Sequence, residues 1–328
     1  MNKDFSWAGR PVVLTGAGGF LGAWLAKALL EKGAQVICLI RDGVPNNLLT
    51  MLGVADKVHI VRGDIINYSE VERAINEYDA KTVFHLAAQA LVGTANRSPL
   101  STFESNIKGT WNVLEAARVI DTVEETIVAS SDKAYGSQPV LPYTEDASMN
   151  GLHPYDASKS CTDILARTYA HTWDMPVTVT RCGNLYGGGD LNWNRIVPDT
   201  IQALVHGKSP QIRSDGKFMR DYLYVEDAAE AYMCLAEQTT RKDVRGRAFN
   251  FGLGRPVPVL EVVNELCEIH GARIEPTILN QAAGEIRDQY LDCNLAKDVL
   301  GWTPRHNLTE GLQQAYTWYT DYLRKQQQ

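Results

Sequence analysis

Short apolar runs alternate with segments of helical periodicity along the first half of the chain. Six runs, each apolar at successive positions, predict buried strands at 11–16, 34–40, 57–64, 82–88, 125–131 and 177–183. The segments between them predict helices, notably at 20–32, 69–78, 101–119 and 155–172. Because the strands are apolar on both faces and alternate with helices, the pattern predicts an α/β fold with a doubly wound parallel sheet.

The rhythm loosens after residue 183, where glycine and proline become frequent and irregular segments separate the helices. This change predicts two domains, a sheet domain over 1–183 and a smaller mixed α/β domain over 184–328. Within the second part, residues 222–252 again carry strand and helix patterns. We therefore expect the chain to return to the sheet there.

Composition and charge narrow the class of protein. The chain has 328 residues and a net charge of −7, from 32 basic and 39 acidic side chains. This balance argues against a general nucleic-acid or anionic-membrane surface, although a few arginines would suffice to bind a small anion. No apolar run approaches the ~18 residues of a membrane span, and the first residues lack a signal-peptide pattern, so we expect a cytoplasmic protein. Six cysteines without CxxC or Cys/His spacing indicate reduced thiols and no metal site.

A glycine-rich loop follows the first predicted strand. Thr15–Gly22 reads TGAGGFLG, and at a first βα turn such a loop is typical of Rossmann-type dinucleotide-binding sheets. Gly16 permits the tight turn, Gly19 lets the backbone approach a pyrophosphate, and Gly22 lets the helix pack on the strand. The helix N-terminus then offers its amides to the phosphates. The alternative interpretation is a glycine turn without a ligand.

The end of the second predicted strand carries the preference between cofactors. An acid there selects NAD through its ribose, whereas an arginine accommodates the NADP phosphate. Here the strand ends at Ile40 and is followed by Arg41 and Asp42. Arg41 favours NADP, but Asp42 can still reach a ribose and Arg41 can equally be a solvated loop charge. Both cofactors therefore stay open.

Tyr155 and Lys159 lie four residues apart on a predicted helix and therefore share one face. A phenol is a poor base at neutral pH, and an ammonium one turn away plus a nicotinamide cation would lower its pKa. Such a phenol can take a proton from an alcohol while the alcohol carbon gives up a hydride. The YxxxK pattern alone is frequent by chance, but Ser131 at the end of the fifth predicted strand makes it more specific.

Together these motifs resemble the short-chain dehydrogenase/reductase superfamily. Nearly the whole chain is similar to its extended branch, the nucleotide-sugar epimerase/dehydratase family, and most similar to CDP-glucose 4,6-dehydratase-like enzymes. The resemblance implies a tightly bound, recycled NAD or NADP, and a homodimer built from the helices at 101–119 and 155–172. The cofactor contacts that it implies are Gly16, Gly19, Phe20, Leu21, Gly22, Arg41, Asp64, Ile65, Leu86, Ala87, Ala88, Tyr155 and Lys159.

The resemblance also implies a binding site for a nucleotide diphosphate hexose. Arg220 and Arg287 lie at positions where the family binds the diphosphate, and guanidinium groups suit diphosphates because they bond bidentately. Taken singly, each arginine can also be part of a surface ion pair. The other implied substrate contacts are Gln89, Ser131, Asn184, Asn194, Arg195 and Val197.

The two residues after Ser131 distinguish two reactions. Sugar 4-epimerases usually have small neutral residues there, whereas 4,6-dehydratases have an acid and a base, because a 6-hydroxyl must leave and a C5 proton must be removed. Asp132 and Lys133 resemble the CDP-glucose type. That resemblance makes Asp132 the acid and Lys133 the C5 base or its electrostatic helper. The alternative is an ion pair on a surface loop.

The expected activity is therefore that of a nucleotide-sugar 4,6-dehydratase with Ser131, Asp132, Lys133, Tyr155 and Lys159 as catalytic residues. Two other classes stay open. A nucleotide-sugar 4-epimerase would use the serine, tyrosine and second lysine alone, and a non-catalytic regulator would only bind the dinucleotide. Because FMRDYLYVEDAAEAY has the general family form rather than that of CDP-glucose enzymes, the nucleotide also stays open.

Overall fold

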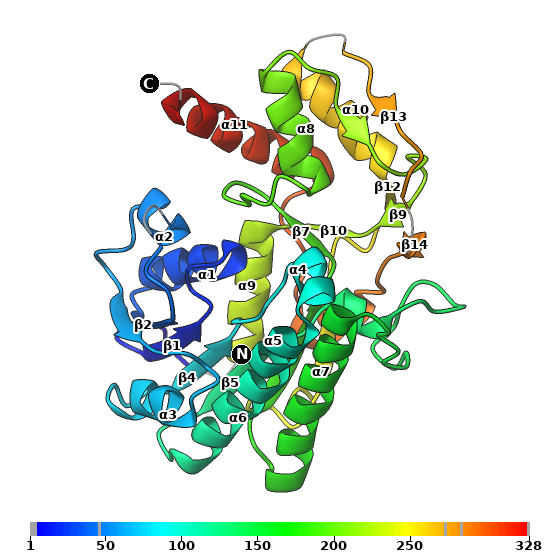
Figure 1. The fold of residues 1–328 in the computed structure, drawn as a ribbon. Helices are drawn as coiled ribbons and strands as arrows, with labels where there is room; N and C mark the ends of the chain where they lie inside the picture. Colours follow the sequence, from blue (N-terminus) through cyan, green and yellow to red (C-terminus); the bar gives the residue numbers. More distant parts are fainter. Residues whose placement is uncertain (1–4, 45–46, 272–273, 283–284, 327–328) are drawn as a thin grey trace.

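A seven-stranded parallel sheet forms the centre of the molecule (Figure 1). The computed structural model describes residues 5–44, 47–271, 274–282 and 285–326. The first residues of the predicted domain 1–183 and the last residues of the predicted domain 184–328 lie outside the described residues. The strand order is β11-β6-β5-β4-β1-β2-β3, and every pairing is parallel. The strands are β1 (Pro11–Thr15), β2 (Gln35–Ile40), β3 (His59–Arg62), β4 (Thr82–His85), β5 (Glu125–Ala129), β6 (Val177–Cys182) and β11 (Ala248–Phe251). This arrangement confirms the predicted Rossmann-type sheet.

Helices cover both faces of this sheet, as the apolar strands predict. On one face, α1 (Phe20–Glu31) packs against α9 (Val225–Ala236), and α9 also contacts β5 and β6. On the other face, α3 (Tyr68–Asn76), α6 (Gly109–Val119) and α7 (Pro154–Trp173) lie in sequence along the sheet. Figure 1 shows α5, α6 and α7 side by side on this second face.

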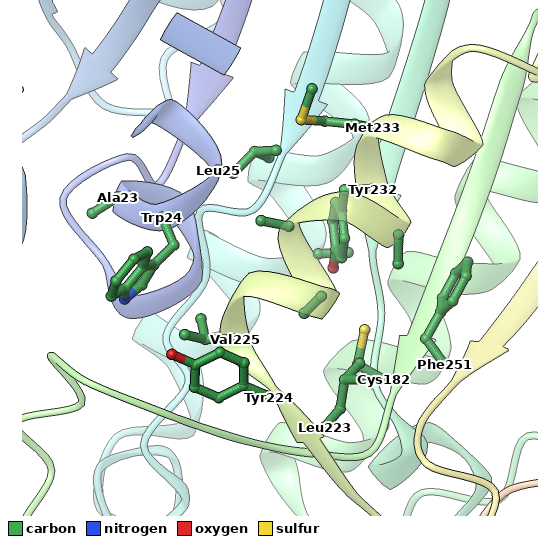
Figure 2. Close-up of a cluster of buried hydrophobic side chains, with 14 of the residues drawn as sticks. Ala23, Trp24, Leu25, Cys182, Leu223, Tyr224, Val225, Tyr232, Met233 and Phe251 are labelled. Atoms are coloured by element: carbon green, nitrogen blue, oxygen red, sulfur yellow. The ribbon is translucent and has the colours of Figure 1, made fainter. Parts of the chain in front are cut away.

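Successive residues of β1 belong to apolar cores on opposite faces of the sheet. In β1, Val12 and Leu14 belong to the core under α1 and α9, whereas Val13 belongs to the core under α3 and α6. Figure 2 shows the first of these cores, which includes Trp24 of α1, Tyr232 of α9 and Phe251 of β11. Because successive side chains of a strand point to opposite faces, a strand buried on both faces must be apolar throughout.

The helix predicted over 101–119 is interrupted in the structure. It consists of α5 (Pro99–Phe103), a widened π-type turn η1 (Glu104–Lys108) and α6. The backbone carbonyl of Asn106 in this turn accepts hydrogen bonds from the hydroxyls of Thr110 (2.6 Å) and Thr162 (2.9 Å). A widened turn of this kind frees a carbonyl from the helix ladder, and such turns are frequent at functional sites.

The C-terminal part forms small sheets and helices above the large sheet (Figure 1). Its strands are β7 (Asn184–Tyr186) paired with β10 (Tyr222–Tyr224), β9 (Met219–Arg220) between β12 (Val257–Pro258) and β14 (Asp288–Gln289), and β8 (Gln211–Ile212) paired with β13 (Thr277–Ile278). Its helices are α8 (Ile196–Val205), α10 (Val259–His270), η3 (Ala296–Leu300) and α11 (Leu308–Gln326). The remaining short helices are α2 (Leu48–Met51), α4 (Val92–Arg97) and η2 (Asp132–Tyr135).

The return of the chain toward the sheet differs in detail from the prediction. Residues 248–251 form β11, which pairs with β6. Residues 222–224, in contrast, pair with β7 and stay outside the large sheet. The reason is that the apolar run continues directly into α9, so the segment reaches the sheet as a covering helix. Among the described residues, none of the helices has the length and apolar character needed to cross a membrane.

Candidate active site

The glycine loop lies between the carboxyl end of β1 and the first turn of α1. Gly16 has a φ of +78°, and a Cβ atom there would lie 2.6 Å from the backbone nitrogen of Ala87. A Cβ atom on Gly22 would lie 2.2 Å from the carbonyl oxygen of Gly16. Both positions therefore require glycine, because the loop folds back on itself and against the segment after β4. At Gly18, in contrast, a Cβ atom would meet no atom within 4 Å.

The N-terminus of α1 fits the phosphates of a dinucleotide. Its N-cap is Gly19, which provides no side-chain cap, and the first turn contains no acidic residue. The amides at Phe20, Leu21 and Gly22 therefore begin the helix without a capping side chain from the loop. A helix N-terminus of this kind at the crevice of a doubly wound sheet suits an anionic pyrophosphate.

The residues predicted around the adenosine lie at the ends of neighbouring strands. The exposed Arg41 donates to Asp42 Oδ2 at 2.7 Å, and its Nη1 lies 3.8 Å from Asp64 Oδ2. Ile65 is buried, and its carbonyl accepts a hydrogen bond from the Asn112 side chain. The segment Leu86–Gln89 follows β4, is half-buried and contains the predicted contacts Leu86, Ala87 and Ala88. It lies beside the end of β1, because the Leu86 amide donates to the carbonyl of Thr15 at 3.2 Å.

The predicted Ser–Tyr–Lys group forms at the ends of β5 and α7. Ser131 follows β5 and lies near Tyr155, its hydroxyl donates to Asp132 Oδ1 at 3.1 Å, and Lys159 is buried one turn further along α7. The Lys159 Nζ donates to the carbonyl oxygen of Ala129 at 2.7 Å. Burial lowers the pKa of Lys159 to about 8, because a buried ammonium loses its hydration.

The phenol of Tyr155 is a weak base in the chain by itself. Burial raises its pKa to about 12, and the neighbouring Ser131 opposes this only partly. The Lys159 ammonium is engaged with the Ala129 carbonyl. The lowering of the phenol pKa by this ammonium together with a nicotinamide cation stays a prediction.

Asp132 and Lys133 form an ion pair, but it is not the surface pair of the alternative interpretation. Asp132 is only 3% exposed, and the Lys133 Nζ lies 3.2 Å from its carboxylate. The same Nζ donates to Gln289 Oε1 at 2.6 Å and lies 3.5 Å from Asn184 Oδ1. The Gln289 Nε2 in turn donates to the backbone oxygen of Asp132 at 3.0 Å. The pair is therefore in contact with polar groups from two other parts of the chain, at Asn184 and Gln289.

The predicted substrate residues around α8 contact neighbouring residues of the C-terminal part. Arg195 pairs with Asp190 at 2.9 Å before α8, and the Asn194 Oδ1 accepts a hydrogen bond from Arg213. Val197 is buried in the first turn of α8. Gln89 is held in place by its backbone, whose amide donates to Asn106 Oδ1 at 2.7 Å.

The two arginines predicted to bind the diphosphate lie close together. The Arg220 side chain donates to the carbonyl oxygens of Ile286 (2.7 Å) and Arg287 (2.6 Å), and so holds the segment that contains the second arginine. The Arg287 side chain itself is exposed. The structure thus places one guanidinium against the backbone of the segment that carries the other.

Three residues of the site escaped the sequence analysis. Asn106 anchors Gln89 and donates to Ser158, and its position in a helical pattern concealed this role. Gln289 lies in a two-residue strand that has no periodicity. Asp221 is buried, and its only signal in the sequence is its place between Arg220 and Tyr222. Its Oδ1 accepts a hydrogen bond from the Leu253 amide at 2.8 Å. Among the described residues its Oδ2 has no hydrogen-bond partner, and burial raises its pKa to about 7.

A cavity of about 370 Å³ lies elsewhere, on the other side of the segment around residue 290. It is lined by residues that include Leu253, Tyr290, Lys297 and Trp302, and by none of the predicted site residues. Among the described residues there is no group of three or more His, Cys, Asp or Glu side chains placed to hold a metal ion. The candidate site is therefore defined by its side-chain geometry at the carboxyl ends of the strands.

Comparison with known proteins identifies the family of the chain. Residues 12–252 match the NAD dependent epimerase/dehydratase family. The chain is 28% identical to the CDP-glucose 4,6-dehydratase of Salmonella typhimurium over 342 residues, which cover 99% of this chain and 94% of the relative. It is similar to the structure of the UDP-glucose 4-epimerase of Thermotoga maritima with UDP-glucose (TM-score 0.87, 28% identity, 95% and 99% coverage). It is also similar to the dTDP-glucose 4,6-dehydratase of Bacillus anthracis in complex with NAD (TM-score 0.82, 25% identity, 95% and 97% coverage).

The fold and the site define a dinucleotide-binding enzyme with a Ser–Tyr–Lys group at the end of a Rossmann-type sheet. The chain belongs to the NAD dependent epimerase/dehydratase family, as the sequence resemblance predicts. Its relatives modify nucleotide sugars, and they include both 4,6-dehydratases and 4-epimerases.

Proposed function

We propose that the protein is a nucleotide-sugar 4,6-dehydratase that forms a 4-keto-6-deoxyhexose. The observation that carries this proposal is the buried Asp132, paired with Lys133 at 3.2 Å directly after Ser131. A buried ion pair is expensive to desolvate, so its presence beside the Ser–Tyr–Lys group calls for a chemical reason. A 4,6-dehydratase supplies one, because it must protonate a leaving hydroxyl and remove a proton at the neighbouring carbon.

The first step assigns the Ser–Tyr–Lys group to oxidation at C4 of the sugar. The Tyr155 phenol accepts the proton of the 4-hydroxyl, and Ser131 donates a hydrogen bond to the developing carbonyl oxygen. Lys159 supplies positive charge near both once it leaves the Ala129 carbonyl. A bound nicotinamide would supply the hydride chemistry, as acceptor at C4 and donor at C6. The glycine loop and the N-terminus of α1 would hold its diphosphate.

The second step assigns Asp132 and Lys133 to the loss of water. Oxidation at C4 acidifies the C5 proton, which Lys133 removes or helps to remove. Asp132 protonates the departing 6-hydroxyl, so the C6–O bond breaks as the C5–C6 double bond forms. The return of hydride at C6 is completed by a proton that Lys133 gives back to C5, and the 4-keto group is kept. Tyr155 then loses its proton to solvent, from which Asp132 is protonated again.

A nucleotide-sugar 4-epimerase is the second candidate. It is supported by the similarity to the Thermotoga maritima epimerase, and it uses the same Ser131, Tyr155 and Lys159. It offers no use for Asp132 and Lys133, since nothing at C5 or C6 has to ionise.

Mass spectrometry on a substrate panel tests the proposal. The protein is incubated with CDP-, dTDP-, UDP- and GDP-activated hexoses, and the products are weighed. Loss of one water, with a 4-keto chromophore in base, is the expected result. A product of unchanged mass with a new sugar configuration would establish the epimerase instead, and no conversion of any member would speak for a regulator.

The cofactor of this proposal is NAD. The Arg41 side chain that favours NADP is engaged by Asp42 and lies near Asp64, so a 2′-phosphate there would meet two carboxylates. The family as a whole is NAD dependent, and the Bacillus anthracis relative binds NAD. Mass spectrometry of the nucleotide released on denaturation checks this assignment. Release of NADP would reverse it.

We further propose that the enzyme is a cytoplasmic homodimer. Apolar side chains are exposed along the face formed by α5, α6 and α7 (Figure 1), and they include Leu100 (72%), Trp111 (43%) and Ile164 (53%). Exposed apolar side chains on neighbouring helices support an interaction site here, and a second copy would form a four-helix interface from α6 and α7. Light scattering at micromolar concentration is expected to give twice the mass of one chain, and a clean monomer would contradict the proposal.

A further inference from the structure

Gln289 connects the two parts of the molecule at the candidate site. Its side chain is 1% exposed and uses both ends of the amide: Oε1 accepts from Lys133 Nζ at 2.6 Å, and Nε2 donates to the backbone oxygen of Asp132 at 3.0 Å. The contact between Gln289 and the lysine spans 156 residues of sequence. A buried amide held at both ends has one orientation, so it fixes the lysine and the aspartate relative to each other.

The strand that carries Gln289 is held by Arg220, one of the two arginines predicted to bind the diphosphate, and it follows the other one in the chain. In the register of β14 with β9, Gln289 lies opposite Arg220. Arg220 donates to the carbonyl oxygens of Ile286 and Arg287, immediately before β14. Arg287 is two residues from Gln289 in the chain. Any group that engages these arginines therefore acts on the same short strand that holds Lys133.

We propose that Gln289 is a positioning residue that aims Lys133 at the sugar and links its placement to the segment that holds the diphosphate. This inference rests on the proposed dehydratase function, because it assigns Lys133 to the loss of water. Gln289 does not touch the reacting atoms in this proposal and acts only through the lysine. Its neutral amide oxygen offers Nζ a partner other than the carboxylate of Asp132.

The chemical reason for such a residue lies in the ion pair itself. Lys133 and Asp132 are adjacent in the chain, and each must act on a different atom of the sugar. Lys133 Nζ donates to both carboxylate oxygens of Asp132 at 3.2 Å and to Gln289 Oε1 at 2.6 Å, so the glutamine makes the shortest of these three contacts. The glutamine thus fixes where Nζ lies relative to the carboxylate.

The test compares variants of Gln289 with a neighbouring control. Gln289→Met keeps the length of the side chain and removes both hydrogen bonds, whereas Gln289→Glu keeps an oxygen acceptor for Lys133. Tyr290→Phe, at the next position and on the wall of the separate cavity, is the control. Each is assayed with the member of the nucleotide-hexose panel that the parent converts. The rates of cofactor reduction and of 6-deoxy product release are measured separately.

We expect Gln289→Met to slow product release on the order of 10²-fold, as a misplacement of about 1 Å does, and to leave the reduction of the cofactor and the KM unchanged. Gln289→Glu should recover part of the loss, and Tyr290→Phe should match the parent. In a Lys133→Met background, Gln289→Met should add less than about twofold, because a residue that acts through the lysine has nothing left to position.

The outcomes separate this inference from the proposed function. If Lys133→Met releases product at the parent rate, or if no panel member loses water, the dehydratase assignment fails and the role of Gln289 fails with it. If Lys133→Met collapses product release but Gln289→Met does not, the inference about Gln289 alone is overturned. Crystal structures of the parent and of Gln289→Met give a readout without turnover. An unmoved Lys133 Nζ in the variant would also overturn it.

Discussion

The glycine loop and the acid–base cluster lie at the same edge of the sheet but are built in opposite ways. The loop is one continuous segment, and its shape depends on backbone contacts that allow no Cβ atom at Gly16 or Gly22. The cluster gathers Asp132, Lys133 and Gln289 through side-chain hydrogen bonds that span 156 residues of sequence. The loop can therefore tolerate change wherever space is open, whereas the cluster depends on individual functional groups.

The largest effect is expected where the cluster is broken directly. The double variant Asp132→Asn, Lys133→Met removes the carboxyl proton and the amine with little change in volume. Reduction of the cofactor by substrate in a single turnover should persist, while release of 6-deoxy product should fall by about 10²–10⁴ for each lost group. Stopped-flow absorbance at the reduced-cofactor band and product mass give the two rates.

A control for this double variant is Asp146→Asn, which alters an exposed acid on the following loop. It should behave like the parent. If the double variant epimerises a nucleotide sugar at close to the parent rate, the two residues are only an ion pair and the dehydratase proposal is wrong.

Tyr155→Phe is expected to abolish turnover while the cofactor stays bound. The ring packs in either case, but proton transfer needs the phenol oxygen, so the rate should fall by at least about 10²-fold. Turnover and the cofactor content of the purified variant are both measured. Near-normal turnover would remove Tyr155 from the mechanism, and loss of cofactor would show that the hydroxyl serves binding instead.

The loop is tested by a matched pair of glycine substitutions. Gly22→Ala places a Cβ atom 2.2 Å from the carbonyl oxygen of Gly16, so the loop must open, at a cost of about 1–3 kcal/mol in the free energy of unfolding. Bound NAD should be lost as well. Gly18→Ala meets no atom within 4 Å and should retain both stability and cofactor. Equal behaviour of the two variants would contradict the geometry of the loop.

The smallest effect is expected at Asp221. Burial raises the pKa of its carboxyl from 3.8 to about 7. Because the folded state binds this proton more tightly than the unfolded state, the carboxyl contributes stability at low pH that is lost as the pH rises through about 7. Asp221→Asn keeps an oxygen for the Leu253 amide and does not ionise. It should therefore be more stable than the parent at pH 8, on the order of 1 kcal/mol, and this gain should shrink at pH 5.

Urea denaturation at both pH values measures this difference. A gain of the same size at pH 5 and pH 8 would show that the carboxyl does not titrate on unfolding.

The sheet and the Ser–Tyr–Lys group could be predicted from the sequence because both depend on local pattern. Strands buried on both faces must be apolar throughout, and Tyr155 and Lys159 lie one helical turn apart. Gln289 could not be predicted, because a strand of two residues has no periodicity and its partners are distant in sequence. The π-type turn at Asn106 escaped for a related reason. Its cause is a set of tertiary hydrogen bonds, while the local residues favour an ordinary helix.

The outermost strand, β11, has a consequence for the synthesis of the protein. It completes the sheet beside β6, yet six elements from β7 to α9 separate the two in the chain. At about 5–20 residues per second, the ribosome needs several seconds to release residues 184–247. During that time β6 is an open edge whose backbone groups can pair with another chain. A nascent chain that pauses before residue 248 is therefore the species most in need of a chaperone.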